Sequence, residues 1–212
     1  APMIRQRACV YSICALLLAS PGATLAEPMD LTFRSQANPD FWLKPTLGAH
    51  TAWFAQNNAW AGEDRALLGG ETDGWAEFGV QPGLEGGWFL GRAGSLRVRA
   101  SAIYTTTQFG LDAAGTNLDP RHPDELTLEE AYLEWASGEL FPKLGKDAVE
   151  LSFGAQKYEV GTGFLFSDGG QDGGRRGGYW LALRKAFELT GVARLSTGPL
   201  ELEAVYLRPN DD

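Results

Sequence analysis

Apolar and polar residues alternate along several segments of this chain, as they do in β-strands whose two faces meet different surroundings. The clearest segment runs from Leu96 to Phe109. Its even positions are apolar from Leu96 to Tyr104, whereas its odd positions include Arg97 and Arg99. Repeated strands of this kind in an exported protein predict a transmembrane β-barrel, with an apolar face toward lipid and a polar face toward a water-filled lumen.

Seven segments with strand character follow one another, separated by stretches rich in Gly, Pro or acidic residues. Within the second segment, Leu84-Glu85-Gly86-Gly87 predicts a bend. The connections after the first, third and fifth segments are long, and the others are shorter, which is typical of up-and-down outer-membrane barrels. The expected strands are 43–56, 74–90, 96–109, 126–135, 148–157, 187–195 and 200–207.

The fourth segment carries several acids, and strict alternation assigns each acid to a face. Glu130 and Glu134 would share the polar face with Tyr132. The adjacent Glu129 and Glu130 would point to opposite faces. We therefore expect that these two carboxylates do not flank one bond as a glycosidase pair does.

The N-terminal residues have the pattern of a secretory signal. Arg5 and Arg7 precede an apolar run, 8–19, and small residues allow cleavage after Ala26. The apolar run is shorter than the roughly 20 residues that a membrane helix needs. We expect residues 1–26 to be a signal peptide and residues 27–212 to be the N-terminal part of one outer-membrane barrel domain, preceded by a short polar lead-in.

Charge and cysteine content exclude several functions for the mature chain. Both cysteines lie inside the signal, which excludes a disulfide scaffold or a cysteine nucleophile. The signal also holds two of the 18 basic residues and none of the 27 acidic ones, so the mature net charge is −11. Nucleic acid is a poor partner for such an acidic chain.

No cofactor, metal site or enzyme active site is expected. His50 and His122 are the two histidines, and neither has the spacing of a zinc site or a catalytic triad. The stretch Asp168-Gly-Gly-Gln-Asp172 has calcium-binding side chains but matches no calcium-loop pattern. Turn glycines around solvated acids explain it better.

Several motifs resemble those of the alginate export family of outer-membrane porins. They are Gly154-Ala-Gln-Lys-Tyr158, Gly161-Thr-Gly-Phe164, the glycine-rich run from Asp168 to Trp180, Arg184-Lys-Ala-Phe187 and the strand from Glu125 to Trp135. The resemblance implies an 18-stranded monomeric barrel whose arginine-lined lumen passes a polyanionic polysaccharide. An odd strand count and two free sheet edges also predict an N-terminal fragment of a larger, closed barrel.

The candidate lumen-lining residues are charged. Inward arginines can bind carboxylates of a solute, or they can pair with lumenal acids and complete the wall. In the long loop before 187–195, an alginate-exporter-like arrangement would fold arginines inward, whereas a solvated outer loop would not. The candidates are Arg97, Arg99, Glu130, Glu134, Arg175, Arg176, Arg184 and Arg194.

These features together favour a passive, monomeric channel of the bacterial outer membrane. Its partners would be outer-membrane lipid and a hydrophilic or polyanionic solute. Two alternatives remain open. One is a barrel-type outer-membrane lipid hydrolase, and the other is a secreted carbohydrate-binding β-sandwich with two apolar inner faces.

Overall fold

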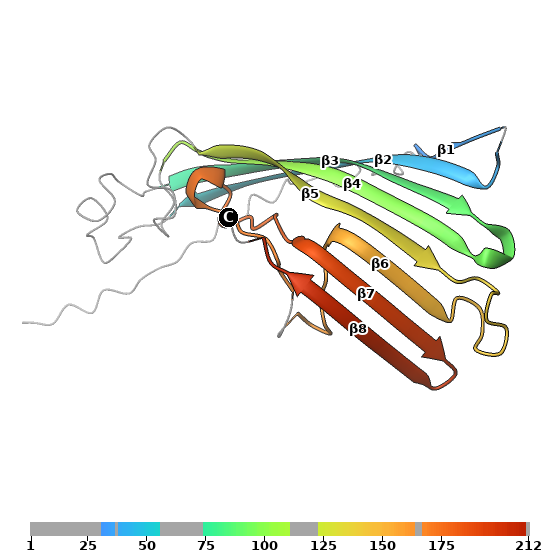
Figure 1. Ribbon diagram of the computed structural model, residues 1–212. Helices are drawn as coiled ribbons and strands as arrows, with labels where there is room; N and C mark the ends of the chain where they lie inside the picture. Colours follow the sequence, from blue (N-terminus) through green and yellow to red (C-terminus); the bar gives the residue numbers. More distant parts are fainter. Residues whose placement is uncertain (1–30, 37, 56–73, 111–122, 164–166, 211–212) are drawn as a thin grey trace, which may run out of the picture.

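The computed structural model describes residues 31–36, 38–55, 74–110, 123–163 and 167–210. These residues form one antiparallel sheet whose strands lie side by side in chain order (Figure 1). The strands are β1 (Phe33–Arg34), β2 (Phe41–Ala55), β3 (Gly74–Phe89), β4 (Ser95–Gln108), β5 (Asp124–Ala136), β6 (Val149–Gln156), β7 (Phe187–Thr197) and β8 (Leu200–Arg208).

The described part contains two single-turn 3₁₀ helices, η2 (Gly91–Ala93) and η3 (Gly174–Arg176). None of its helices is long and apolar enough to cross a membrane. The predicted signal peptide, 1–26, and His122 lie outside the described residues.

The all-β, up-and-down antiparallel fold is confirmed, with two corrections to the strands. The described sheet has eight strands rather than seven, because the two-residue β1 in the expected lead-in pairs with Trp42 and Leu43 of β2. The bend predicted at 84–87 is wrong. Glu85 lies between Lys44 of β2 and Arg99 of β4, so β3 continues through this stretch, paired on both sides.

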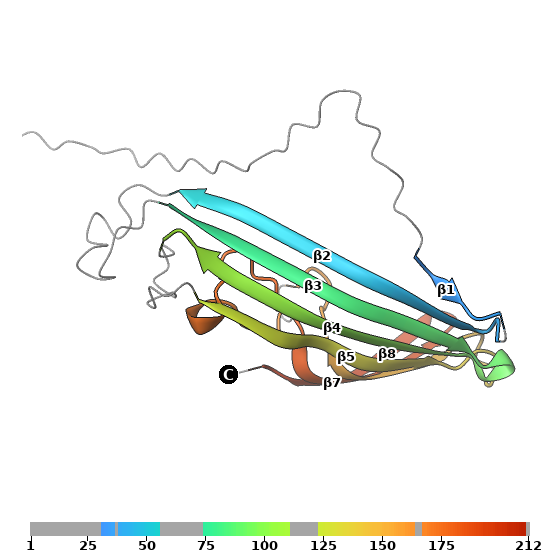
Figure 2. The ribbon, with the colours of Figure 1, turned by 90° about the horizontal axis from the view of Figure 1, so that it is seen from above.

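The described sheet is open, and the larger transmembrane barrel of which it was expected to be a part stays a prediction. β1 and β8 each have one neighbour in the strand order of the described residues. Figure 2, seen from above, shows β2 to β5 side by side with β7 and β8 lying beneath them. The sheet is therefore strongly curved but does not close on itself.

The two faces of the sheet differ in chemistry, and we call them the apolar face and the polar face. On the apolar face, Leu47, Phe78 and Phe153 are 74%, 37% and 62% exposed. On the polar face, Glu77, Thr105 and other polar or charged side chains are fully buried. This distribution is the reverse of that in a water-soluble domain, where large apolar side chains are buried and charges are exposed.

A β-bulge in β5 changes the face that each residue occupies. Ser101 pairs with Glu130 and the next residue, Ala102, pairs with Leu128, so Glu129 is the extra residue. Glu129 and Glu130 are both buried and both bond to polar-face partners. The expectation that these acids point to opposite faces is therefore wrong. The bulge also keeps Leu126 and Leu128 on the same face as Leu133, and all three are exposed.

The connection between β6 and β7 returns over the sheet. We call residues 167–186 the inner segment. It lies beneath β3, β4 and β5 in Figure 1, on the side toward which the sheet curves. Its backbone bonds to polar-face side chains of all three strands. The polar face is thus covered at one end by the chain itself.

Candidate functional site

Ion pairs between neighbouring strands occupy the polar face. Arg97 of β4 lies opposite Glu134 of β5, and their side chains are 3.2 Å apart. Arg99 Nε lies 3.0 Å from Glu130 Oε2, and Arg194 of β7 pairs with Glu203 of β8. Cross-strand register explains these pairs, because Arg97 and Arg194 lie directly opposite their glutamates, whereas Arg99 and Glu130 are diagonal neighbours on the same face.

These arginines differ in how much they remain accessible. The side chains of Arg97 and Arg194 are 50% and 44% exposed, so they keep donors free beside their acidic partners. Glu130 is buried and also accepts a hydrogen bond from Ser101 Oγ at 3.2 Å. The exposed arginines can therefore meet a solute, whereas the Glu130 carboxylate is engaged by Ser101 and Arg99.

Two carboxylates of the polar face bind the backbone of the inner segment. Glu77 of β3 accepts hydrogen bonds from the backbone N–H groups of Trp180, at 3.2 Å, and Leu181, at 2.8 Å. Glu129 accepts from those of Lys185, at 2.8 Å, and Ala186, at 3.1 Å. Charge-assisted bonds of this kind are stronger than neutral ones. They hold the second half of the inner segment against the sheet.

Arg184 is the central anchor of the inner segment. It is 4% exposed, and its Nη1 lies 2.6 Å from Asp172 Oδ1. Its Nε donates to Thr127 Oγ1 at 3.1 Å, and its Nη2 donates to the Glu125 carbonyl at 2.9 Å. The prediction that Arg184 is accessible to a solute is therefore wrong, because its N–H donors bind partners inside the protein.

The other arginines of the inner segment pair with the same acid. Arg176 Nε lies 3.3 Å and Arg175 Nε 3.7 Å from Glu125 Oε2. Arg176 is buried, whereas the Arg175 side chain is 74% exposed. Among the three predicted loop arginines, Arg175, Arg176 and Arg184, only Arg175 has an exposed side chain.

Glycine allows η3 to approach β4 closely. Gly177 has φ of 65°, and an added Cβ would lie 2.6 Å from the Pro123 carbonyl oxygen and 2.7 Å from Thr107 N. Nearby, Thr105 Oγ1 donates to the Arg176 carbonyl at 2.7 Å, and Gly178 N donates to Thr107 Oγ1 at 2.9 Å. A residue with a side chain would be strained in this conformation and would collide with Pro123 and Thr107.

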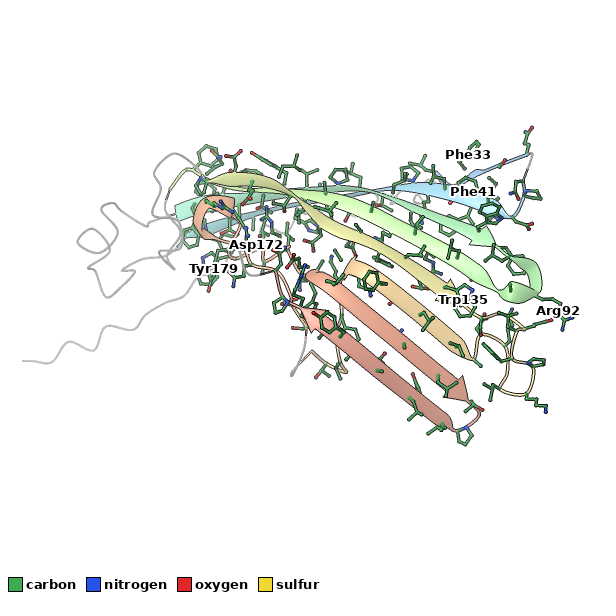
Figure 3. The ribbon with its side chains drawn as sticks, in the orientation of Figure 1. Phe33, Phe41, Arg92, Trp135, Asp172 and Tyr179 are labelled. Carbon is green, nitrogen blue, oxygen red and sulfur yellow. The ribbon has the colours of Figure 1, made fainter. Side chains whose placement is uncertain are left out.

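An aromatic cluster joins the inner segment to β2 and β3. Trp75 stacks on Phe54 with 5.2 Å between ring centroids, and Trp180 lies 6.1 Å from each of them. Trp75 Nε1 also donates to Glu77 at 3.2 Å. Tyr179 packs edge-on against Trp180. Figure 3 shows Tyr179 and Asp172 together beneath the sheet, in the region of the inner segment.

Two groups outside the strands have shifted pKa values. Burial raises the pKa of Asp172, and the hydrogen bonds from Arg184 oppose that rise. The hydrogen bond to Glu203 raises the pKa of Tyr158. Both groups are occupied by protein partners.

The acids of the glycine-rich stretch pair with cations of the same segment. Asp168 Oδ1 lies 3.6 Å from Lys185 Nζ, and Asp172 pairs with Arg184. Within the described ranges, no group of three or more His, Cys, Asp or Glu side chains is placed to hold a metal ion.

The anchoring acids Glu77, Glu129 and Asp172 are not among the candidate lumen-lining residues of the sequence. Sequence did carry one signal for Glu129: apolar residues fall on even positions at 126 and 128 and on odd positions from 131, which requires an extra residue between them. Alternation places Glu77 on the polar face, but nothing local indicates its backbone partners, which lie more than 100 positions away in the chain. Comparisons with protein-family models, characterised proteins and solved structures gave no match.

Proposed function

We propose that this sheet is part of an outer-membrane β-barrel and that its polar face lines an aqueous passage for hydrophilic solutes. The observation that carries the proposal is the reversed distribution of side chains. Large apolar residues are exposed on β2 to β6 and on β8, while several acids and threonines of the strands are buried on the other face. A wall between lipid and water needs this arrangement.

The apolar face favours lipid over a protein core as its neighbour. In the described residues, one sheet contains all the strands, so no second sheet packs on this face as a soluble sandwich requires. Each fully exposed apolar side chain would cost about 1.5–3 kcal/mol in water relative to an apolar environment. Hydrocarbon around β2 to β8 removes that cost.

The polar face favours a lumen of mixed charge. Arg97 and Arg194 are half-exposed, but each lies beside glutamates. Such a wall offers weak, successive sites rather than one tight site, which suits passage. We propose passage of hydrophilic solutes, including anionic polysaccharides of the kind suggested by the alginate-export resemblance. The inner segment, fixed on the polar face, would narrow the lumen.

Two measurements on the full chain test this proposal. Cell fractionation with detergent extraction asks whether the protein resides in the outer membrane. Single-channel recording in a planar bilayer under a salt gradient then asks whether it conducts. Stable ohmic steps from detergent-extracted protein are expected. A folded protein that stays in the water-soluble fraction, or that never conducts, would contradict the proposal.

The ion selectivity of arginine variants tests whether an arginine contacts the permeating ions or only pairs with neighbouring acids. Arg97→Gln and Arg194→Gln should each shift the reversal potential toward cations if these side chains line the passage. Arg92→Gln is the matched control, because Arg92 is exposed in η2 and pairs with Glu139 at 3.8 Å in the short-turn region. An equal shift in all three variants would remove Arg97 and Arg194 from the ion path.

A further inference from the structure

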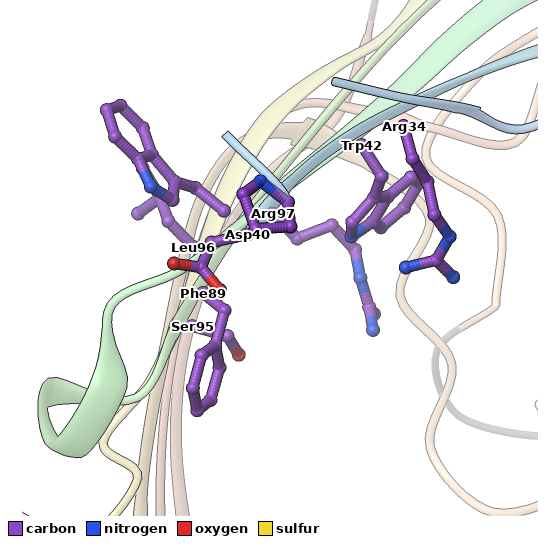
Figure 4. A pocket seen from close by; sticks show the side chains of 9 residues that line it. Arg34, Asp40, Trp42, Phe89, Ser95, Leu96 and Arg97 are labelled. Carbon is purple, nitrogen blue, oxygen red and sulfur yellow. The ribbon is translucent and has the colours of Figure 1, made fainter. Parts of the chain in front are cut away.

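A pocket of about 370 Å³ lies at the short-turn end of the sheet, away from the inner segment. Its lining includes Arg34 from β1, Trp42 from β2 and Arg97 from β4, together with one acid, Asp40. Figure 4 shows the Trp42 indole between the two arginine side chains, with both guanidinium groups extending to the same side. The pocket therefore offers an aromatic surface between two cations.

Strand register places these three residues in one row across the polar face. Arg34 pairs with Trp42, Trp42 pairs with Gly87, and Gly87 pairs with Arg97. Neighbouring strands are about 4.8 Å apart, so the Trp42 and Arg97 backbones are separated by about 10 Å. A side chain at position 87 would collide with the Trp42 indole. The ring therefore lies across Gly87 and spans the space toward Arg97.

Both cations keep donors available to a ligand. Arg97 pairs with Glu134 at 3.2 Å and approaches Glu85 at 3.7 Å, yet half of its side chain is exposed. Lys44 lies opposite Glu85 in the register, which offsets that acid. Among the described residues, no hydrogen bond or ion pair engages the exposed Arg34 guanidinium. Five N–H donors of Arg34 thus face solvent.

We propose that Arg34, Trp42 and Arg97 form a binding site for a small carboxylate attached to a ring, from either an aromatic acid or a cyclic sugar acid. The indole stacks against the ring, and the guanidinium groups bind the carboxylate through charge-assisted hydrogen bonds. The site rests on the proposed function, because the ligand reaches the polar face from an aqueous lumen. It would concentrate such solutes at the short-turn mouth.

Calorimetric titration of the full-length protein in detergent tests the site with four probes: benzoate, glucuronate, benzyl alcohol and acetate. Benzoate or glucuronate should bind at least tenfold more tightly than both benzyl alcohol, which lacks the charge, and acetate, which lacks the ring. Tighter benzoate binding identifies an aromatic acid as the ligand class, and tighter glucuronate binding identifies a sugar acid. Binding of neither, or equal binding of benzoate and benzyl alcohol, overturns the proposal.

Variants assign the binding to this pocket. Arg34→Gln and Trp42→Leu should each weaken binding about tenfold, whereas Arg92→Gln, with the same charge change outside the pocket, should leave it unchanged. Unchanged affinity in Arg34→Gln overturns the proposal, and the wild-type probe series decides the matter if Trp42→Leu does not fold. If the protein conducts in a bilayer but binds neither benzoate nor glucuronate, the binding site alone is overturned. Binding without channels would support the site and contradict the aqueous passage.

Discussion

Asp172 and Arg184 make two contacts within the inner segment, a side-chain ion pair and a backbone hydrogen bond. Asp172 Oδ1 lies 2.6 Å from Arg184 Nη1, and Asp172 Oδ2 accepts a hydrogen bond from Arg184 N at 2.9 Å. Both side chains are almost fully buried. The pair closes the chain between them into a loop, and the remaining donors of Arg184 fix that loop to Thr127 and to the Glu125 carbonyl. One side chain thus links the internal structure of the segment to the sheet.

Replacing Arg184 by Gln should release the inner segment from the polar face. The change leaves the Asp172 carboxylate buried without its cation, which typically costs about 3–5 kcal/mol. We expect faster protease cleavage within residues 167–186 of the folded protein, with cleavage elsewhere unchanged. Limited proteolysis followed by mass spectrometry measures this.

A surface ion pair provides the control for that variant. Arg208 pairs with Glu188, and both side chains are about half-exposed, so Arg208→Gln should cost less than about 1 kcal/mol. Adding Asp172→Asn to Arg184→Gln should recover part of the loss, because the stranded charge is removed. Equal cleavage of Arg184→Gln and wild type would show that Arg184 does not hold the segment.

Sequence predicted the strands well because each strand has one apolar and one polar face. The observed bounds of β2 to β8 differ from the expected ones by two residues or fewer at each end. The sequence did not predict β1, because its two residues are too few to show alternation. Glycines at 86 and 87 indicated a bend, but pairing with strands on both sides overrides their conformational freedom.

The anchoring of the inner segment was much less predictable. Sequence placed Arg184 in a charged loop, but not the distant partners that bury it. The ion pairs of Arg97 and Arg99 were open to prediction, since alternation already placed those arginines and Glu130 and Glu134 on one face. Long-range backbone-to-carboxylate bonds have no such periodic signal.

Glu77→Gln should loosen the backbone at Trp180 and Leu181. Both Glu77 oxygens accept N–H groups there, and an amide would turn one acceptor into a donor facing a donor. A buried mismatch of this kind costs about 1–3 kcal/mol. Hydrogen exchange measured by mass spectrometry should show lost protection around residues 179–182.

Glu85→Gln serves as the comparison for Glu77. Glu85 lies on the same strand and the same face but contacts Arg97 rather than the inner segment. Protection near Trp180 should therefore be unchanged in Glu85→Gln. Loss of protection in both variants would point to a general loosening of β3 instead.

Deleting Glu129 should preserve the faces of β5 while freeing part of the inner segment. The bulge residue is the extra one, so its removal leaves Leu128 and Glu130 on their present faces in a regular strand. The bonds to Lys185 N and Ala186 N are lost. The protein should still show heat-modifiable gel mobility, which reports a folded barrel, and should be cleaved faster near Lys185.

Deletion of Ala131 is the matched test of that interpretation. A regular strand without Ala131 would place Glu130 on the apolar face, where a charge is costly in lipid. We expect this variant to lose heat-modifiable mobility. Folding of the Ala131 deletion together with failure of the Glu129 deletion would contradict the assignment of the bulge.

Gly177→Ala should destabilise the protein more than Gly161→Ala. Both glycines have positive φ, 65° and 62°, so both substitutions carry a backbone penalty of about 1–2 kcal/mol. Only position 177 would also bring Cβ against Pro123 and Thr107, whereas nothing described lies within 4 Å of a Cβ at 161. Thermal unfolding in detergent should show the larger loss for Gly177→Ala. Equal losses would mean that η3 does not lie against β4.

Phe153→Arg tests which face of the sheet meets lipid. Phe153 lies on β6 and is 62% exposed on the apolar face, while the adjacent Ser152 lies opposite Glu134 on the polar face. In a bilayer, arginine on the lipid face costs about 2–4 kcal/mol near the midplane. Ser152→Arg should cost far less, because a guanidinium there meets water and Glu134. Urea unfolding in lipid vesicles measures both variants.

The two variants are matched in position and in added charge, so their difference reports the face alone. If the apolar face met water, Phe153→Arg would be tolerated, since arginine is well hydrated there and the strand keeps its register. Comparable stability of the two variants in vesicles would therefore contradict the membrane assignment. A loss confined to Phe153→Arg, together with retained conductance of Ser152→Arg, is the outcome that a lipid-facing apolar surface requires, because only that surface penalises charge while the opposite one tolerates it.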